Sequence, residues 1–252
     1  MEGVAYDKWW GGLPSPPAEC DHWRTWKSAL QTQSVMFRIK ICGITKPDDA
    51  CLVAEAGADA IGLNFYAKSK RYVAREIAKE IAAVLPASVA KVGVFVNASA
   101  DEIRQLASEV PLDYVQLHGD EPAEILTELR DIQVIKAHRC RERGLLSLAR
   151  SLADVDSDAQ PCAVLVDAYH HAQYGGTGRS LDWTEVGRQK SLLGQLPVIL
   201  AGGLTPVNVA RAIRLAGPYA VDTASGVESS PGVKDAQKVK AFVQNAKKVF
   251  NG

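Results

Sequence analysis

Apolar residues recur along the chain in short runs, and each run is followed by a segment in which apolar positions have helical spacing. Runs rich in Val, Ile and Leu predict buried strands at 37–42, 60–65, 91–96, 114–117, 133–137, 163–167, 197–201 and 220–224. Helical patterns lie near 47–56, 75–84, 100–109, 122–130, 141–153, 183–193, 206–216 and 233–249. Pro47, Pro122 and Pro206 suit the first turn of a helix, where a missing N–H costs nothing.

This alternation predicts an α/β protein with a single-domain (β/α)8 barrel at residues 36–252. An open doubly wound sheet is the alternative, but no G-x-G-x-x-G motif follows the first strand. Residues 1–35 break the pattern, since they hold four of the five tryptophans and a proline-rich stretch without the layout of a signal peptide. We expect an N-terminal extension there, disordered or loosely packed; a helix that caps the barrel through Trp23, Trp26 and Leu30 is the rival.

The composition narrows the class of partner. Lys plus Arg and Asp plus Glu balance at 29 each, so no basic field indicates nucleic acid or a membrane surface. No apolar run approaches the roughly 18 residues of a membrane helix. The five cysteines are scattered and form no C-x-x-C pair, which favours a reducing cytoplasm over a disulfide framework or a zinc site.

Two glycine-containing turns follow the last two predicted strands. Gly202-Gly203 closes the run 197–201, and Ser225-Gly226 closes the run 220–224. Glycines ahead of a helix leave backbone N–H groups accessible, and the helix dipole adds positive potential, so each turn is suited to a phosphate. Either turn alone is an ordinary tight turn; the pair, after strands seven and eight of a barrel, predicts a phosphorylated small molecule as ligand.

Polar residues interrupt the predicted strands near their carboxyl ends, where active sites of this fold lie. They are Lys40, Cys42, Asn64, Gln116, His118, Lys136, Asp167 and Asp222. Buried polar groups are costly unless they pair with one another or with a ligand. Lys40 and Asp222 fall on neighbouring strands and are candidates for a buried ion pair, whereas some of the others, such as Gln116, are expected to be structural.

Three of the candidate site residues carry distinct chemistry. Cys42 ends the first strand before Gly43, whose turn would expose the sulfur, and nearby positive charge would favour a basic thiolate. Asp167 ends the sixth strand, where an apolar mouth can keep a carboxyl protonated as an acid. A glycine-rich loop at 174–178 follows and is suited to closing over a substrate. The guanidinium of Arg71 suits a carboxylate or phosphate.

Several segments then occur in a fixed order over residues 37–250: KICGIT (40–45), Phe65 with SKRYV (69–73), VGVFVN (92–97), VQLHGDEP (115–122), VIKA (134–137), the Asp167 strand with YGGTGRSLDW (174–183), ILAGGLTPVNV (199–209) and AVDTASGVESSPGVKD (220–235). In this order they resemble the phosphoribosylanthranilate isomerase family of tryptophan biosynthesis. Residues 1–35 lie outside the resemblance, and the segments 138–140 and 168–174 are locally unusual within it.

The resemblance implies a cytoplasmic isomerase that needs no cofactor and no metal. It implies an Amadori rearrangement in which Asp167 protonates the furanose ring oxygen and Cys42 takes the proton from C2′. By the same resemblance Arg71 holds the anthranilate carboxylate, and Gly202, Gly203, Ser225 and Gly226 hold the phosphate. His118 and Asp222 are further expected substrate contacts, and the enzyme is expected to act as a monomer or homodimer.

Two other readings fit the glycine turns. Another phosphate-binding barrel enzyme, such as an indole-glycerol-phosphate synthase or a pentose-phosphate epimerase, would need a Lys and Glu constellation or metal-binding His and Asp residues. A catalytically silent phosphosugar-binding barrel would be expected to lose Cys42 or Asp167, and both are present.

The change of composition at Met36 generates a first prediction. A chain shortened to begin at Met36 keeps every predicted strand, so its melting temperature and its activity should stay close to those of the full chain. Thermal unfolding of both chains measures this. A fall of many degrees on truncation would instead favour a capping role for Trp23, Trp26 and Leu30.

Overall fold

The computed structural model describes residues 36–139, 144–167 and 183–252. The expected extension at 1–35 and the glycine-rich loop at 174–178 lie outside these ranges. The fold therefore rests on the residues from Phe37 onward, which include every predicted strand.

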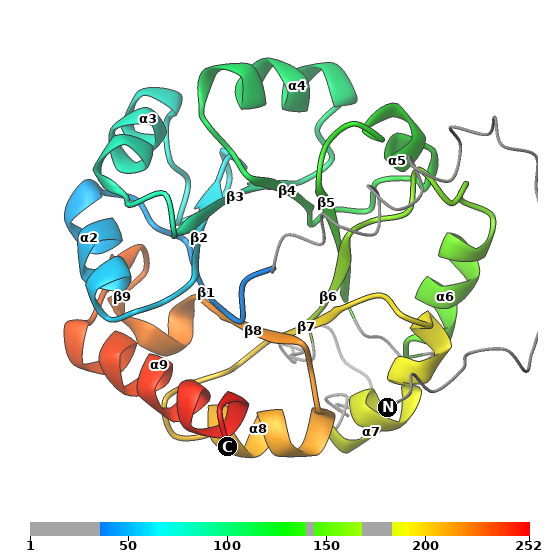
Figure 1. The fold of residues 1–252 in the computed structure, drawn as a ribbon. Helices are drawn as coiled ribbons and strands as arrows, with labels where there is room; N and C mark the ends of the chain where they lie inside the picture. The colour runs from blue at the N-terminus through cyan, green and yellow to red at the C-terminus, as the bar shows by residue number, and fades with distance from the viewer. Residues whose placement is uncertain (1–35, 140–143, 168–182) are drawn as a thin grey trace, which may run out of the picture. The chain divides into compact units, whose positions relative to one another are not determined.

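Eight parallel strands form a closed barrel in sequence order (Figure 1). They are β1 (Ile39–Cys42), β2 (Ala60–Asn64), β3 (Ala90–Phe95), β4 (Tyr114–Leu117), β5 (Val134–Arg139), β6 (Ala163–Asp167), β7 (Val198–Ala201) and β8 (Ala220–Thr223). Each strand begins and ends within two residues of its predicted bounds, which is the difference expected when bounds are predicted from sequence pattern alone.

The first and last strands pair with each other, which closes the barrel and excludes the open doubly wound sheet. Ile39, Lys40 and Ile41 of β1 lie opposite Val221, Asp222 and Thr223 of β8. Both faces of the strands are buried, because the barrel interior and the surrounding helices each cover one face. This is why the strands read as apolar runs with few polar interruptions.

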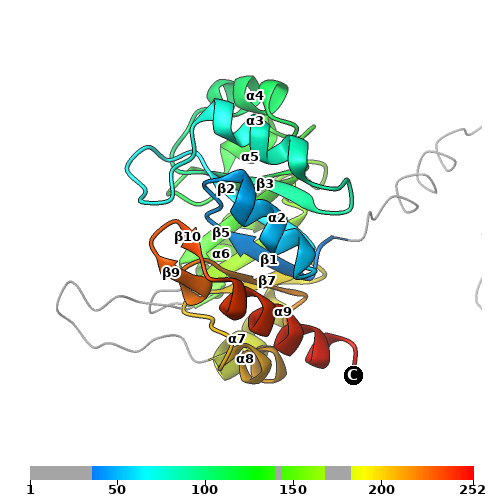
Figure 2. The same cartoon turned by 90° about the vertical axis from the view of Figure 1, so that its left-hand side faces the viewer.

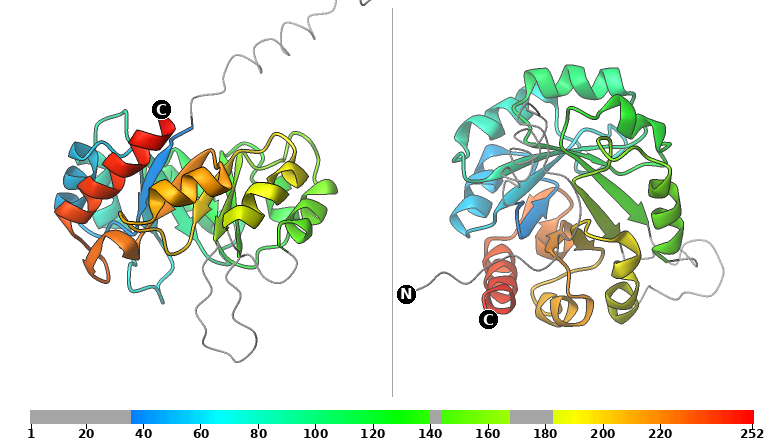
Figure 3. Two further views of the ribbon diagram at one scale, coloured as in Figure 1. Left: turned by 90° about the horizontal axis from the view of Figure 1, so that it is seen from below. Right: turned by 45° about the vertical axis from the view of Figure 1, so that its right-hand side comes forward.

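Helices connect the strands and cover the outside of the barrel. They are α2 (Pro47–Glu55), α3 (Arg75–Val84), α4 (Ala100–Glu109), α5 (Glu124–Glu128), α6 (Leu146–Ala153), α7 (Trp183–Gln189) with the 3-10 turn η1 (Lys190–Leu193), α8 (Val209–Ala216) and α9 (Ala236–Phe250). Figure 3 shows α8 and α9 side by side against the outside of the barrel. None of the described helices is both long and apolar enough to span a lipid bilayer.

Two proline positions differ from expectation. Pro47 opens α2 as predicted, but α5 and α8 begin after Pro122 and Pro206, at Glu124 and Val209. At α8 the delay has a local cause: the Asn208 side chain accepts a hydrogen bond from the Thr205 amide at 2.7 Å and donates one to the Gly203 carbonyl at 3.0 Å. These bonds form a turn between β7 and the helix.

A short hairpin precedes α9 and was not predicted. After β8 the chain makes a 3-10 turn, η2 (Ser225–Val227), and then pairs β9 (Glu228–Ser230) with β10 (Val233–Lys234). The last helix begins at Ala236 instead of 233, because the Asp235 side chain caps it by accepting from the Lys238 amide. In Figure 2 the hairpin lies on the same side of the barrel as the segment between β2 and α3.

Candidate active site

The polar residues of the strands gather at the carboxyl end of the barrel. Cys42, Asn64 and Asp167 are the last residues of β1, β2 and β6, and His118 directly follows β4. Because all eight strands are parallel, these positions lie on one rim. The rim is therefore the candidate active site.

The predicted pair of Lys40 and Asp222 is confirmed. The Lys40 ammonium lies 3.0 Å from the Asp222 carboxylate, and the Lys40 side chain is fully buried. Burial lowers the pKa of Lys40, but the charges of Asp222 and Cys42 outweigh burial and raise the pKa overall. Lys40 therefore stays charged inside the barrel, directly beneath the end of β1.

The position of Cys42 depends on two glycines. Gly43 has a φ of 76°, so the chain turns sharply after β1, as expected from sequence. Gly62 of β2 lies opposite Cys42, and a Cβ on Gly62 would lie 2.6 Å from the Cys42 sulfur. Any side chain at 62 would therefore displace the thiol from the barrel mouth.

The electrostatic surroundings of Cys42 are mixed. Burial raises the pKa of the Cys42 thiol, Lys40 and Lys234 lower it, and Asp222 raises it; burial prevails, so the pKa lies above its ordinary value. The thiol is thus protonated at neutral pH. The ammonium groups of Lys40 and Lys234 nevertheless stabilise the thiolate form of Cys42.

Asp167 faces the rim from β6, on a different part of the barrel from Cys42. Burial, Lys40 and Arg139 lower the pKa of His118, whereas Asp167 and Asp222 raise it. The net pKa of His118 is lowered, so the imidazole is neutral at pH 7. Asp167 and His118 therefore lie close enough on the rim to interact electrostatically.

His118 is held by its neighbours at several points. Its ring Nδ1 lies 2.7 Å from the Gln116 amide nitrogen, and its carbonyl accepts from Arg139 at 2.9 Å. Its backbone amide donates to the Phe95 carbonyl of the preceding strand. With Nδ1 accepting from Gln116, the neutral ring carries its proton on Nε2. Gln116 is structural in this respect, as the sequence suggested.

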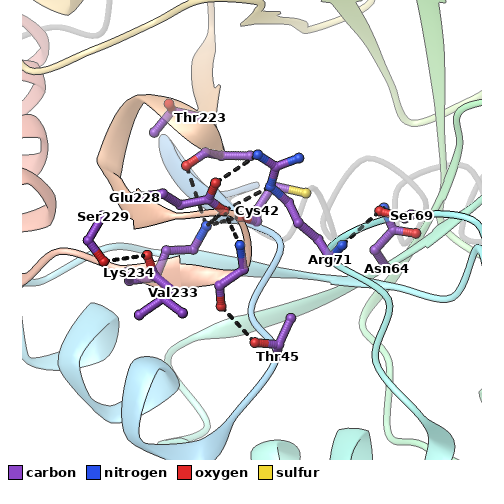
Figure 4. Close-up of polar contacts among 12 residues, drawn as sticks. Cys42, Thr45, Asn64, Ser69, Arg71, Thr223, Glu228, Ser229, Val233 and Lys234 are labelled. Atoms are coloured by element: carbon purple, nitrogen blue, oxygen red, sulfur yellow. Dashed lines mark hydrogen bonds and ion pairs between the residues drawn. The ribbon is translucent and has the colours of Figure 1, made fainter.

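Arg71 lies in the segment after β2 and reaches the β9–β10 hairpin. Its Nε and Nη2 donate to the two carboxylate oxygens of Glu228, at 2.8 and 2.7 Å. Lys234 donates to Glu228 at 2.8 Å and to the Cys42 carbonyl at 2.7 Å. Figure 4 shows Arg71, Glu228 and Lys234 beside Cys42. This cluster joins the end of β1, the β2–α3 segment and the hairpin.

The two glycine turns lie against each other, although neither stands directly at the start of an α-helix. Gly202 and Gly203 have φ of 89° and 66°, and α8 begins at Val209; Ser225 and Gly226 lie in the 3-10 turn η2. The Thr223 hydroxyl donates to the Leu204 carbonyl at 2.7 Å, and a Cβ on Gly226 would lie 1.8 Å from that carbonyl oxygen. The prediction that a helix begins directly after each turn is thus wrong, but the backbone amides of the two turns still lie near each other.

The other rim candidates have structural partners. Asn64 donates to Ser69 at 3.2 Å and accepts from the Tyr66 amide at 2.9 Å, so it shapes the segment that carries Arg71. Lys136 donates to Glu121 at 2.6 Å. In the part of the chain that the structure describes, no group of three or more His, Cys, Asp or Glu side chains is placed to hold a metal ion.

Glu228 and Lys234 belong to the site but were not predicted from the sequence. Both stand in the segment 220–235 that carried the resemblance, on either side of Pro231-Gly232. That dipeptide is a turn signal, and a turn between two residues of opposite charge was a usable sign of a hairpin held by an ion pair. Nothing in the local pattern connected this hairpin with Arg71.

Comparisons with known proteins agree on one family. A family profile described as N-(5'phosphoribosyl)anthranilate (PRA) isomerase matches residues 39–245. The N-(5'-phosphoribosyl)anthranilate isomerase of Trichlorobacter lovleyi is 46% identical over 215 residues, which are 85% of this chain and 100% of that protein.

Solved structures give the same answer. The phosphoribosyl anthranilate isomerase of Thermotoga maritima has a TM-score of 0.74 and 41% identity, over 84% of this chain and 100% of that chain. A phosphoribosyl anthranilate isomerase in complex with reduced 1-(o-carboxyphenylamino)-1-deoxyribulose 5-phosphate has a TM-score of 0.72 and 40% identity, over 84% of this chain and all of that one.

The surroundings of Cys42 predict how its reactivity depends on pH. Only the thiolate reacts with iodoacetamide, and burial raises the pKa of Cys42. The rate of Cys42 alkylation should therefore rise with pH, and the midpoint of this rise should lie above the ordinary thiol pKa of about 8.5. Mass spectrometry of peptides separates Cys42 from the control Cys162, for which burial raises the pKa to about 12 and alkylation should be slower still. A midpoint for Cys42 at or below the ordinary value would contradict the prediction.

Proposed function

The chain belongs to the N-(5'-phosphoribosyl)anthranilate isomerase family, and we propose that Cys42 and Asp167 are its acid–base pair. The enzyme is an isomerase of tryptophan biosynthesis. It converts N-(5′-phosphoribosyl)anthranilate to 1-(2-carboxyphenylamino)-1-deoxyribulose 5-phosphate by an Amadori rearrangement, the third step from chorismate. Loss of phosphoribosylanthranilate fluorescence on addition of the purified protein tests this activity directly.

The proposed mechanism assigns the first proton transfer to Asp167. Asp167 gives a proton to the furanose ring oxygen, the bond from C1′ to that oxygen breaks, and the anilino nitrogen lone pair completes an iminium. The iminium draws electrons from C1′ and so acidifies the C2′ proton. The placement of Asp167 at the end of β6, on the same rim as Cys42 but on another strand, supports this division.

Cys42 carries the second proton transfer in this proposal. The Cys42 thiol first loses its proton to solvent, and the resulting thiolate takes the proton from C2′. The electrons of the C2′–H bond form the C1′=C2′ double bond of an enolamine, which ketonises to the product. Lys40 and Lys234 lower the pKa of Cys42, whereas burial raises it. These opposing effects support a base that is mostly protonated before substrate reacts and whose thiolate is stabilised by two ammonium groups once it forms. The residues proposed here supply both proton transfers, so the proposed steps need no cofactor.

The remaining rim residues are proposed to bind substrate. Arg71 grips the anthranilate carboxylate, and the neutral imidazole of His118 offers its Nε2–H to the substrate. Asp222, held by Lys40, accepts from a sugar hydroxyl. The backbone amides of Gly202, Gly203, Ser225 and Gly226 hold the phosphate; within the described residues the amides of Gly202 and Gly203 make no hydrogen bond, which supports this assignment.

We further propose that the enzyme acts in the cytoplasm as a monomer or homodimer, with the small phosphorylated substrate as its partner and without nucleic acid or membrane. The balanced charge of the chain supports the part of this proposal that concerns nucleic acid and membrane surfaces. Size-exclusion chromatography with light scattering distinguishes the two oligomeric states.

The role of Cys42 predicts a large loss of turnover in one cysteine variant. Cys42→Ser keeps the size of the side chain but raises its pKa far above the working pH, so kcat should fall roughly 10²–10⁴-fold. Cys51→Ser and Cys162→Ser are matched controls and should keep most of their activity. Steady-state kinetics decide the matter, and a Cys42→Ser variant with wild-type kcat would remove Cys42 from the mechanism.

Asp167 and Arg71 should separate in their kinetic effects. Asp167→Asn cannot donate the transferred proton, so kcat should fall strongly while substrate still binds. The carboxylate gripped by Arg71 has the same charge in substrate and transition state, so Arg71→Met should mainly raise KM, by about ten- to a hundredfold. Measurement of kcat and KM for both variants checks the roles. Loss of turnover at saturating substrate in Arg71→Met, or a pure KM effect in Asp167→Asn, would contradict them.

A further inference from the structure

The Arg71 guanidinium is already engaged along one edge. Its Nε and Nη2 meet both oxygens of the Glu228 carboxylate, so the planar fork has a fixed direction. A guanidinium has five N–H donors, and this contact uses two of them. Within the described residues Nη1 makes no hydrogen bond, so the opposite edge, formed by Nη1 and the second hydrogen of Nη2, is open to another carboxylate.

Glu228 is well placed to fix this direction because it is itself held firmly. Its side chain is 4% exposed, against 26% for Arg71. Lys234, whose side chain is fully buried, donates at 2.8 Å to Glu228 Oε1, the oxygen that also accepts from Arg71 Nε. The Gly232 amide donates to the same oxygen at 3.3 Å. The Glu228 carboxylate is therefore held by contacts that do not depend on Arg71.

The stem of Arg71 is confined as well. A Cβ on Gly43 would lie 2.4 Å from the Arg71 Cδ, so the side chain rests on the backbone that follows Cys42. Lys234 donates to the Cys42 carbonyl at 2.7 Å, and the Ala224 carbonyl, just before Ser225-Gly226, lies 3.4 Å away. The same ammonium thus contacts the backbone of the proposed base and the backbone next to the proposed phosphate turn.

The charges of the cluster do not cancel, so Glu228 does more than neutralise the positive charge of Arg71. Arg71 and Lys234 carry two positive charges, and Glu228 carries one negative charge, so the cluster keeps a net positive charge toward an incoming anion. The pKa of Glu228 is lowered by Arg71 and Lys234 against the effect of burial, so the carboxylate stays ionised.

We propose that Glu228 is a positioning residue that aims the free edge of Arg71 at the carboxylate of the substrate, with Lys234 as its anchor. The inference rests on the proposed role of Arg71. It assigns to the β9–β10 hairpin the selection of an aryl amine that carries an ortho-carboxylate.

The test compares two ligands in calorimetric titrations. One is reduced 1-(o-carboxyphenylamino)-1-deoxyribulose 5-phosphate, and the other is the same molecule built from aniline, without the carboxylate. In the unmodified enzyme the carboxylate should increase affinity about ten- to a hundredfold. In Glu228→Gln that ratio should shrink about tenfold while the ligand without the carboxylate binds as before, and KM should rise more than kcat falls.

The matched control is Asp131→Asn, which breaks a bidentate carboxylate contact with Arg104 away from the rim and should leave the ratio unchanged. If Glu228→Gln does not fold, Glu228→Asp keeps the charge beside Lys234 but is too short to hold both Arg71 donors, and it must show the smaller ratio.

Three outcomes would overturn the proposal. An unchanged ratio in the Glu228 variants would show that Arg71 needs no aiming. An equal loss for both ligands would show a structural role only. An unchanged ratio in Arg71→Met would remove the proposed role of Arg71 itself, and this result is distinct because it does not involve Glu228.

Discussion

The pairing of β1 with β8 is the constraint on which the site depends. Closure places Lys40 opposite Asp222, 182 residues later in the chain, and so joins the start of the barrel to its last strand. Since removal of one partner of a buried ion pair costs about 3–5 kcal/mol, the pair also fixes the register in which closure occurs. A slip by one residue would turn Lys40 out of the interior and Cys42 away from its present position.

Closure also explains why residues from opposite ends of the sequence share one rim. Cys42 stands at the end of β1, whereas the two proposed phosphate-binding turns and the β9–β10 hairpin follow β7 and β8. Lys234 connects these parts, because its buried ammonium contacts Glu228 and the Cys42 carbonyl. The hairpin is short and would not be stable alone, so it owes its shape to these contacts.

The sequence predicted the features that depend on local pattern and on parallel-strand geometry. The eight strands, the rim and the Lys40–Asp222 pair follow from apolar runs interrupted by polar residues at one end. The hairpin did not, because Glu228–Ser230 is short and polar, and its main partner Arg71 is 157 residues away in sequence. The start of α8 was misjudged because the Asn208 side chain competes for the turn that Pro206 seemed to open. Long-range ion pairs and side-chain turns leave too weak a periodic signal to be read from one sequence.

The order of the two proposed proton transfers follows from charge. Burial holds the pKa of Cys42 above its ordinary value, so in the proposed mechanism a thiolate is scarce before the ring opens. In the proposed mechanism, protonation by Asp167 creates a cationic iminium at C1′, next to the carbon that Cys42 deprotonates. A positive charge close to a thiol favours its ionised form and so lowers its pKa. The iminium thus favours the thiolate at the moment when the C2′ proton has become acidic. The proposal therefore places the acid before the base, because the product of the first step favours ionisation of Cys42. Lys40 and Lys234 lower the pKa of Cys42 in the same direction.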